Sequence, residues 1–243
     1  MQVSLINYTG IGHPDPLFAG KILAYTKNTR LQMTPDGLDA FMRKPDLEIL
    51  QELAYMATTI PSSLEFVDLT FSVQGISRAT AQQVTRTRSA SYAMQSQRVT
   101  DMRDVTWDAR GGWFDTAMQS SIDDYQQLVE GGMTLEDARD VLPIGVHCNI
   151  LCKYNFRAFV DLVRARDSLR VQGPYREMVA AMKAELLKVW PWAQEFFTPK
   201  DSLAINLIEE VAKDLAAVGG EQGAMYKGLT GKLAKAADLL KKE

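Results

Sequence analysis

Arg86-Thr-Arg-Ser-Ala-Ser-Tyr-Ala-Met-Gln-Ser-Gln-Arg98 is the most informative stretch of this chain, with three arginines, three serines and no lysine or carboxylate. An arginine presents a planar fork of donors that fits phosphate or carboxylate oxygens two at a time. Serine hydroxyls and backbone N–H groups can bond the remaining oxygens of such an anion. The stretch therefore predicts a cradle for a phosphorylated small molecule. A solvated helix end, whose arginines pair with acidic neighbours, is the alternative that this stretch alone leaves open.

The segments on either side predict a chain that mixes helices and strands. In Glu65–Gln74, apolar and polar residues alternate, which is typical of a strand with one buried face. Ser77 then predicts the cap of a helix over Ala79–Arg88, so the arginines begin on a helix and continue into a loop over Ser89–Gln97. A first strand is expected over Val3–Tyr8. Further helices are expected from Thr34-Pro35, over 46–59 and 114–130, from Thr134, and over 146–170 and 175–190.

No internal boundary is evident in the chain. One α+β domain over residues 1–200 is the simplest account, followed by an Ala/Lys/Glu-rich helical extension over 201–243. The composition, 46% hydrophobic and 23% charged, is typical of a soluble globular protein. With a net charge of −3, without an apolar run approaching ~18 residues and without a signal-peptide pattern, the chain is expected to be cytoplasmic. It is expected to bind neither nucleic acid nor membrane.

The cysteines and histidines suggest neither a metal site nor a nucleophile. Cys148 and Cys152 are four residues apart, which predicts one face of a helix, and no further Cys/His set accompanies them. We expect no metal and reduced core thiols. His13 and His147 are the only histidines, and neither lies in a nucleophile signature.

The order of these elements resembles the flavin-dependent thymidylate synthases. That family has a signature of the form Arg-His-Arg-x-x-Ser-x-Asn-x-x-Ser-x-Arg, which the quoted stretch follows. Upstream, the family often shows His-x-Ser-x-x-Glu-His, and here Ile60-Pro-Ser-Ser-Leu-Glu-Phe66 precedes the strand. Downstream, Ala138-Arg-Asp-Val-Leu-Pro143 resembles its Ala-Arg-x-x-Leu-Pro element. Its later Asn-x-Arg, Leu-Arg and Ala-Gln positions are matched by Asn155-Phe-Arg157, Arg164-Ala-Arg166 and Gln172. The resemblance covers roughly residues 1–195.

The resemblance implies a fold, a reaction and an assembly. The fold is a central, mostly antiparallel sheet flanked by helices. The reaction is the methylation of dUMP at C5 to give dTMP, with methylene-tetrahydrofolate as carbon donor and FAD, reduced by NADPH, as hydride donor. The family forms homotetramers whose active sites combine several chains. No protein nucleophile is required, because the flavin and the polarised substrate carry the chemistry.

The resemblance also implies roles for individual residues. Arg166 would lie against the pyrimidine and stabilise negative charge on the ring, which makes it the catalytic candidate. The nucleotide would be held by Gln83, Arg86, Ser96, Arg98, Arg139 and Arg166. The flavin would contact Arg86, Thr87, Arg88, Asn155 and Asp161, and Glu65 would lie near the flavin or the folate. For Arg139 a surface salt bridge with its acidic neighbours stays open, and Arg157 and Arg164 are expected to form structural ion pairs near Asp161.

Several positions depart from the family pattern. Thr87 replaces the signature histidine, Ala93 replaces its asparagine, and Met94 stands where many members have glutamate. Ile60 and Phe66 replace the upstream histidines, and Asp161 stands where the family often has asparagine. Two alternatives therefore stay open. One is a pyrimidine deoxynucleotide hydroxymethylase or dCMP-acting enzyme of a DNA-modifying virus, working in the host cytoplasm. The other is a non-catalytic nucleotide-binding relative.

Overall fold

The computed structural model describes residues 1–27, 35–166, 173–197, 208 and 211, in two units, Met1–Ala193 and Gln194–Glu243. The first unit contains β1 (Gln2–Tyr8), α1 (Phe18–Thr26), α2 (Pro35–Met42), α3 (Asp46–Thr59), η2 (Pro61–Phe66), β2 (Asp68–Ser77), α4 (Arg78–Val84), β3 (Ala90–Met94), α5 (Gly112–Glu130), α6 (Leu135–Ala138), η3 (Arg139–Val141), β4 (His147–Asn155), α7 (Phe156–Arg166), α8 (Gly173–Val189) and η4 (Pro191–Ala193). The second begins with α9 (Gln194–Phe197). The extension predicted over 201–243 lies outside the described residues apart from Ile208 and Val211.

The sheet has four strands in the order β1-β2-β4-β3, and every pair of neighbours is antiparallel. β2 is central, with Phe71 opposite Leu5 on one side and Cys152 on the other. Its burial alternates residue by residue from Asp68 to Val73, as its sequence predicts. The α+β fold with an antiparallel sheet is thereby confirmed.

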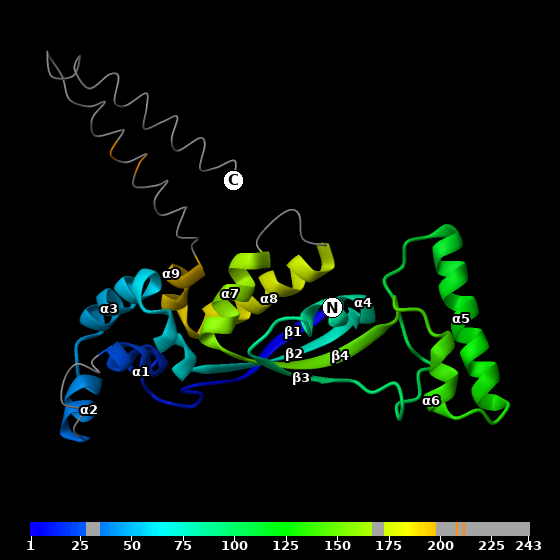
Figure 1. The fold of residues 1–243 in the computed structure, drawn as a ribbon, viewed down its shortest axis with the longest axis horizontal. Helices are drawn as coiled ribbons and strands as arrows, with labels where there is room; N and C mark the ends of the chain where they lie inside the picture. Colours follow the sequence, from blue (N-terminus) through cyan, green and yellow to red (C-terminus); the bar gives the residue numbers. More distant parts are fainter. Residues whose placement is uncertain (28–34, 167–172, 198–207, 209–210, 212–243) are drawn as a thin grey trace, which may run out of the picture. The chain divides into compact units, whose positions relative to one another are not determined.

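Helices α7 and α8 cover one face of this sheet (Figure 1). The alternate residues of β2 and β4 that point to this face are buried, and Phe71 stacks on Phe159 of α7 with ring centroids 5.2 Å apart. Trp190 and Trp192 stack on each other and contact Phe156 edge-on, so both pack in the core. Burial of these apolar and aromatic surfaces is the main force that fixes α7 over the sheet.

The single helix predicted over 146–170 is wrong. Residues His147–Asn155 form β4, and α7 begins only at Phe156. A spacing of four residues returns to the same side of a helix and of a strand alike, so Cys148 and Cys152 did not distinguish the two. Both thiols lie on the buried face of β4. The loop predicted over Ser89–Gln97 is likewise mostly β3, which pairs with β4.

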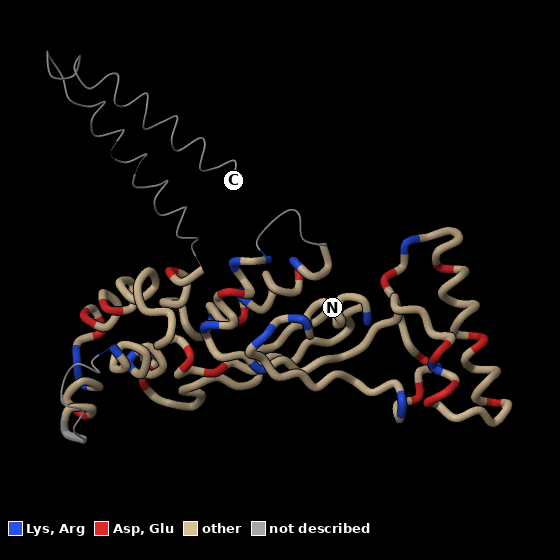
Figure 2. The backbone as a smooth tube through the Cα atoms, in the orientation of Figure 1, with Lys and Arg blue, Asp and Glu red and all other residues tan. Residues whose placement is uncertain are grey.

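Helices α5 and α6 pack around a small core of Met102, Tyr125 and Ala138. Thr134 caps α6 by accepting a hydrogen bond from Asp137 N at 3.2 Å, as its sequence predicts. Acidic side chains are frequent on α5 and α6, whereas basic ones gather near α7 and the sheet (Figure 2). Within the described ranges, no helix has the length and apolar character needed to cross a bilayer.

Candidate functional site

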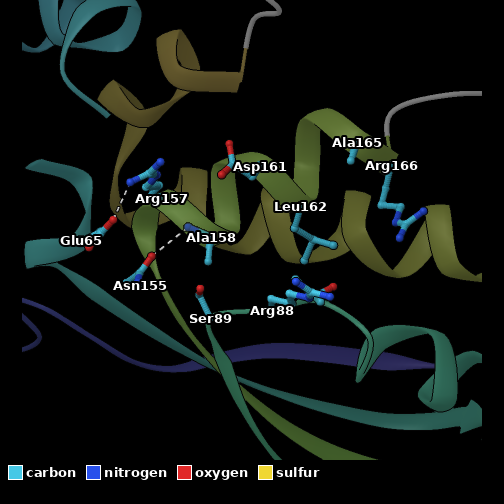
Figure 3. Close-up of a pocket in the computed structure, with 11 residues that line it drawn as sticks. Glu65, Arg88, Ser89, Asn155, Arg157, Ala158, Asp161, Leu162, Ala165 and Arg166 are labelled. Carbon is cyan, nitrogen blue, oxygen red and sulfur yellow. Dashed lines mark hydrogen bonds and ion pairs between the residues drawn. The ribbon is translucent and has the colours of Figure 1, made fainter. Parts of the chain in front are cut away.

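A cleft of about 530 Å³ lies between α7, the end of β4 and the turn before β3 (Figure 3). This volume is in the range of small-molecule binding sites. Its described wall combines three arginines, two carboxylates, an amide and hydroxyls with a few apolar side chains. The wall residues are Glu65, Thr87, Arg88, Ser89, Asn155, Arg157, Ala158, Asp161, Leu162, Ala165 and Arg166.

The pairing of β3 with β4 brings the walls of the cleft together. Ala90 lies opposite Tyr154 in the antiparallel register, so the turn that precedes β3 reaches the end of β4 at Asn155. Ser89 in this turn has a φ of 59°, the left-handed region that residues other than glycine rarely adopt. Such strained positions tend to occur at functional sites. In Figure 3, Arg88 and Ser89 rise from this turn toward α7.

Asn155 joins β4 to α7 and caps the helix. Its Oδ1 accepts a hydrogen bond from Ala158 N at 2.8 Å, which satisfies one of the free N–H groups of the first turn. Among the described residues no partner is recorded for the amide NH₂ group of Asn155, which leaves it as a donor at the cleft wall. The amino end of α7 also contributes a partial positive charge there. An anion or an electron-rich ring edge is favoured at this end of the cleft.

Arg157 in the first turn of α7 donates to Glu65 of η2, with Nη1 and Oε1 2.7 Å apart. The prediction of structural ion pairs is confirmed for Arg157, whose partner is Glu65 and not Asp161. It is not confirmed for Arg164, which forms no ion pair within the described residues and whose buried Nε has no hydrogen-bond partner there. Both side chains are about half exposed, so solvent screens the pair and it contributes little stability. Because both residues line the cleft, a charged ligand bound there would compete with one partner of this ion pair.

Arg166, the last residue of α7, reaches down toward Arg88 in Figure 3. Its guanidinium carbon lies 4.9 Å from the ring centroid of Tyr175 in α8, within the range of a cation–π contact. Its Nε is buried, and no hydrogen-bond partner reaches it from the described part of the chain. An arginine with an unused buried donor is suited to an acceptor supplied by a ligand.

Six predicted site residues meet in this cleft: Glu65, Thr87, Arg88, Asn155, Asp161 and Arg166. The other five predicted residues are absent from its described wall. These are Gln83 on α4, the exposed Arg86 after it, Ser96 and Arg98 after β3, and Arg139 in η3. Arg98 instead approaches Glu136 of α6, with Nε and Oε2 3.6 Å apart. Within a single chain, the predicted flavin residues other than Arg86 are therefore separated from most of the predicted nucleotide residues.

Five wall residues were not predicted as site residues: Ser89, Arg157, Ala158, Leu162 and Ala165. Spacing could have indicated three of them, because positions 158, 162 and 165 lie on one face of a helix with the predicted Asp161. Because residues 146–170 were predicted to form one helix, the start of this helix face at Phe156 could not be recognised. Ser89 carried a weaker signal, as the serine that directly follows Arg88.

The departures from the family pattern lie in different places. Ile60 and Phe66 line a second cleft of about 450 Å³ with Tyr55, beside η2. The sulfur of Met94 on β3 accepts a hydrogen bond from Arg78 Nη1 at 3.9 Å. Thr87 and Asp161 are the departures that line the first cleft. The Thr87 carbonyl accepts a hydrogen bond from the Tyr92 hydroxyl at 3.2 Å.

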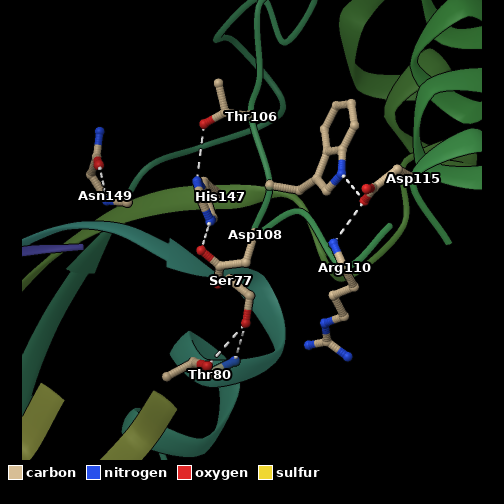
Figure 4. A network of polar contacts seen from close by, with 10 residues as sticks. Ser77, Thr80, Thr106, Asp108, Arg110, Asp115, His147 and Asn149 are labelled. Atoms are coloured by element: carbon tan, nitrogen blue, oxygen red, sulfur yellow. Dashed lines mark hydrogen bonds and ion pairs between the residues drawn. The ribbon is translucent and has the colours of Figure 1, made fainter. Parts of the chain in front are cut away.

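His147, at the opposite end of β4, belongs to a separate polar network (Figure 4). Its Nδ1 and Thr106 Oγ1 are hydrogen-bonded at 3.0 Å, and Asp108 Oδ1 lies 3.1 Å from its Nε2. Nearby, Asp115 accepts from Trp107 Nε1 and from the backbone of Arg110. These contacts attach the segment before α5 to the sheet, which is a structural role.

Comparison with known proteins assigns the family. The sequence model of the family described as thymidylate synthase complementing protein matches residues 19–192. The chain is also 32% identical over 197 residues to the flavin-dependent thymidylate synthase of Geobacter sulfurreducens, covering 75% of this chain and 80% of that protein. The chain belongs to the flavin-dependent thymidylate synthase family. A second member, from Sulfolobus acidocaldarius, is 29% identical over 222 residues, covering 86% and 82% of the two chains.

Solved structures share the fold of this family member at lower identity. A flavin-dependent thymidylate synthase from Helicobacter pylori, complexed with FAD and dUMP, superposes with a TM-score of 0.66 at 17% identity, over 81% of this chain and 98% of that one. A UMP/dUMP methylase, PolB, from Streptomyces cacaoi bound with 5-Br dUMP gives a TM-score of 0.62 at 18% identity, over 81% and 94%.

Proposed function

We propose that this chain is an FAD-dependent enzyme that methylates dUMP at C5. In the balanced reaction, dUMP, methylene-tetrahydrofolate, NADPH and a proton give dTMP, tetrahydrofolate and NADP⁺. The observation that carries the proposal is the cleft itself, in which a strand register and a helix end gather Thr87, Arg88, Asn155 and Arg166 from distant parts of the chain.

The cleft residues fit a flavin. Donors for the ring oxygens and nitrogens of a flavin and for its phosphates are the guanidiniums of Arg88, Arg157 and Arg166 and the amide NH₂ of Asn155. Within the described part of the chain, the buried Nε of Arg166 has no hydrogen-bond partner. When bound, FAD would supply the hydride chemistry that side chains lack. The described side chains would bind and orient it. Arg166, at the α8 side of the cleft, would stabilise negative charge on the pyrimidine ring as C5 becomes nucleophilic.

The separation of the predicted nucleotide residues supports a shared site. Ser96, Arg98 and Arg139 lie away from the cleft of their own chain, on the side of β3 and α6. We propose that they complete the cleft of another chain in a homotetramer, where they would hold the nucleotide phosphate. Arg98 is free to do so, because its 3.6 Å contact with Glu136 joins two well-exposed side chains and is weak.

An absorption spectrum followed by product analysis tests this proposal. Purified protein incubated with FAD and desalted should show bound flavin, and added dUMP should perturb its spectrum. With methylene-tetrahydrofolate and NADPH, mass spectrometry should find dUMP converted to a product heavier by one CH₂. Protein that takes up no FAD under these conditions would overturn the proposal.

Two alternative functions are tested in the same assay, because Thr87, Ala93, Ile60 and Phe66 depart from the family pattern. A product heavier by CH₂O, or turnover of dCMP in place of dUMP, would support a hydroxymethylase or a dCMP-acting enzyme. Binding of dUMP without turnover or flavin oxidation would support a non-catalytic relative. UMP belongs in the assay as well, because the structural neighbour PolB is described as a UMP/dUMP methylase.

A further inference from the structure

We propose that Tyr175 is a positioning residue of the cleft, whose ring holds Arg166 and whose hydroxyl holds Thr87. Tyr175 lies in the first turn of α8, is 1% exposed and does not itself line the cleft. Thr87 and Arg166, which it contacts through its hydroxyl and its ring, both line the cleft. The proposal rests on the proposed function, since that function assigns ligand contacts to Arg166 and Thr87.

The ring of Tyr175 fixes the Arg166 side chain. Arg166 is the last residue of α7, and its guanidinium carbon lies 4.9 Å from the Tyr175 ring centroid. The Arg166 Nε has no hydrogen-bond partner among the described residues, so that atom does not orient the side chain. A long side chain with free rotamers at a helix end loses entropy when it binds a ligand. The aromatic face limits those rotamers beforehand, with the guanidinium already at the cleft wall.

The hydroxyl of Tyr175 fixes the turn that carries Arg88. Tyr175 OH and Thr87 Oγ1 are 3.4 Å apart, and either one can be the donor. The Thr87 carbonyl accepts a second hydrogen bond from Tyr92 OH at 3.2 Å. Burial raises the pKa of the Tyr92 phenol above its usual value, so the phenol stays protonated and keeps donating. Thr87 is therefore held from two sides, directly before Arg88 and the strained Ser89.

One phenol thus joins the two walls of the cleft, α7 and the turn before β3. The two contacts can be separated by mutation, because Tyr175→Phe keeps the ring and removes the hydroxyl, while Tyr175→Leu removes both. Thr87→Val removes the other hydroxyl with little change of shape. Tyr125→Phe is the matched control: Tyr125 is also fully buried, its hydroxyl accepts from Met102 N at 3.2 Å, and it lies in the core of α5 and α6.

The ring contact is tested through Arg166 in the FAD-loaded protein. We expect Tyr175→Leu to weaken dUMP binding by about three- to thirtyfold, the range of a cation–π contact, and Tyr175→Phe to restore most of it. In an Arg166→Ala background, Tyr175→Leu should have no further effect, because its effect passes through Arg166. Full additivity of these two substitutions would overturn this half of the proposal.

The hydroxyl contact is tested through FAD binding. Tyr175→Phe and Thr87→Val should each weaken it by about two- to tenfold, the range of one hydrogen bond. The double variant should be no weaker than either single one, and Tyr125→Phe should leave it unchanged. Additive effects of Tyr175→Phe and Thr87→Val, or an equal loss of FAD affinity in Tyr125→Phe, would overturn the role of the Tyr175 hydroxyl. This arm uses near-isosteric changes, so it stays decisive even where Tyr175→Leu unfolds the protein.

A readout without ligand separates this proposal from the proposed function. Arginine modification by phenylglyoxal, mapped by mass spectrometry, should label Arg166 at least about threefold faster in Tyr175→Leu than in the wild type or Tyr175→Phe. The exposed Arg110 is the internal reference. Wild-type protein that binds neither FAD nor dUMP would reject the proposed function, while these rates still decide the role of Tyr175. Equal rates in all three proteins would overturn that role.

Discussion

At the level of single residues, the thiols of Cys148 and Cys152 are buried on β4 and do not line the cleft. Burial raises the pKa of the Cys152 thiol to about 12 and also raises the pKa of Cys148. The thiolate is the reactive form, so both should resist modification at neutral pH while the protein is folded. We expect no reaction with Ellman's reagent at pH 8 in the native protein and two thiols per chain in guanidinium chloride. Rapid labelling of the native protein, or loss of flavin-dependent activity on such labelling, would contradict this.

At the scale of elements, Asp115 in the first turn of α5 organises the segment that leads into that helix. Its carboxylate accepts hydrogen bonds from Arg110 N and Trp107 Nε1, both at 3.0 Å, and from Gly111 N at 2.7 Å. The hydrogen bond from Arg110, followed by that from Trp107, holds the pKa of Asp115 below its ordinary value. The stabilisation is therefore present above about pH 4, the pKa of an unfolded aspartate, and is lost as the pH falls through the folded pKa.

Asp115→Asn removes that titration. In urea unfolding, we expect the free-energy difference between the wild type and Asp115→Asn to be largest near pH 7 and to shrink at pH values below about 4. Asp124→Asn, a change at an exposed position of the same helix, is the control and should show a small difference that does not depend on pH in this way. A difference for Asp115→Asn that stays constant from pH 7 to pH 2.5 would count against this role of the Asp115 carboxylate.

At the scale of the whole molecule, the division of the predicted site between two regions of one chain has a direct consequence. Arg166→Ala and Arg98→Ala should each be nearly inactive alone. If a site takes its cleft from one chain and Arg98 from another, random 1:1 mixing of subunits leaves about a quarter of the sites with both native residues. Co-refolded or co-expressed variants should then recover about that fraction of dTMP synthesis.

The control for this mixing experiment pairs two variants of the same cleft, Arg166→Ala and Arg88→Ala, which line one pocket in one chain. Their mixture should recover no activity, because every site retains one defect or the other. Recovery in the control, or none in the Arg166→Ala and Arg98→Ala mixture, would place the whole site within a single chain.

Local sequence patterns determined several of the helices and strands of this protein. The alternation in β2, the caps at Ser77 and Thr134, and the helix over 46–59 all follow from sterics and hydrogen bonds between near neighbours. The ordered motifs around Arg86–Arg98 also determined the family, which the comparisons confirm.

Only the tertiary structure decided the rest, because proximity between distant segments arises from strand pairing and core packing, which no local period encodes. A four-residue spacing fits a helix and a strand equally, and β4 became a strand through its pairing with β2 and β3. That same pairing placed Arg88 and Ser89 beside Asn155 and α7. Packing of α8 against α7 then placed Tyr175, a residue with no signal in the sequence, between Thr87 and Arg166.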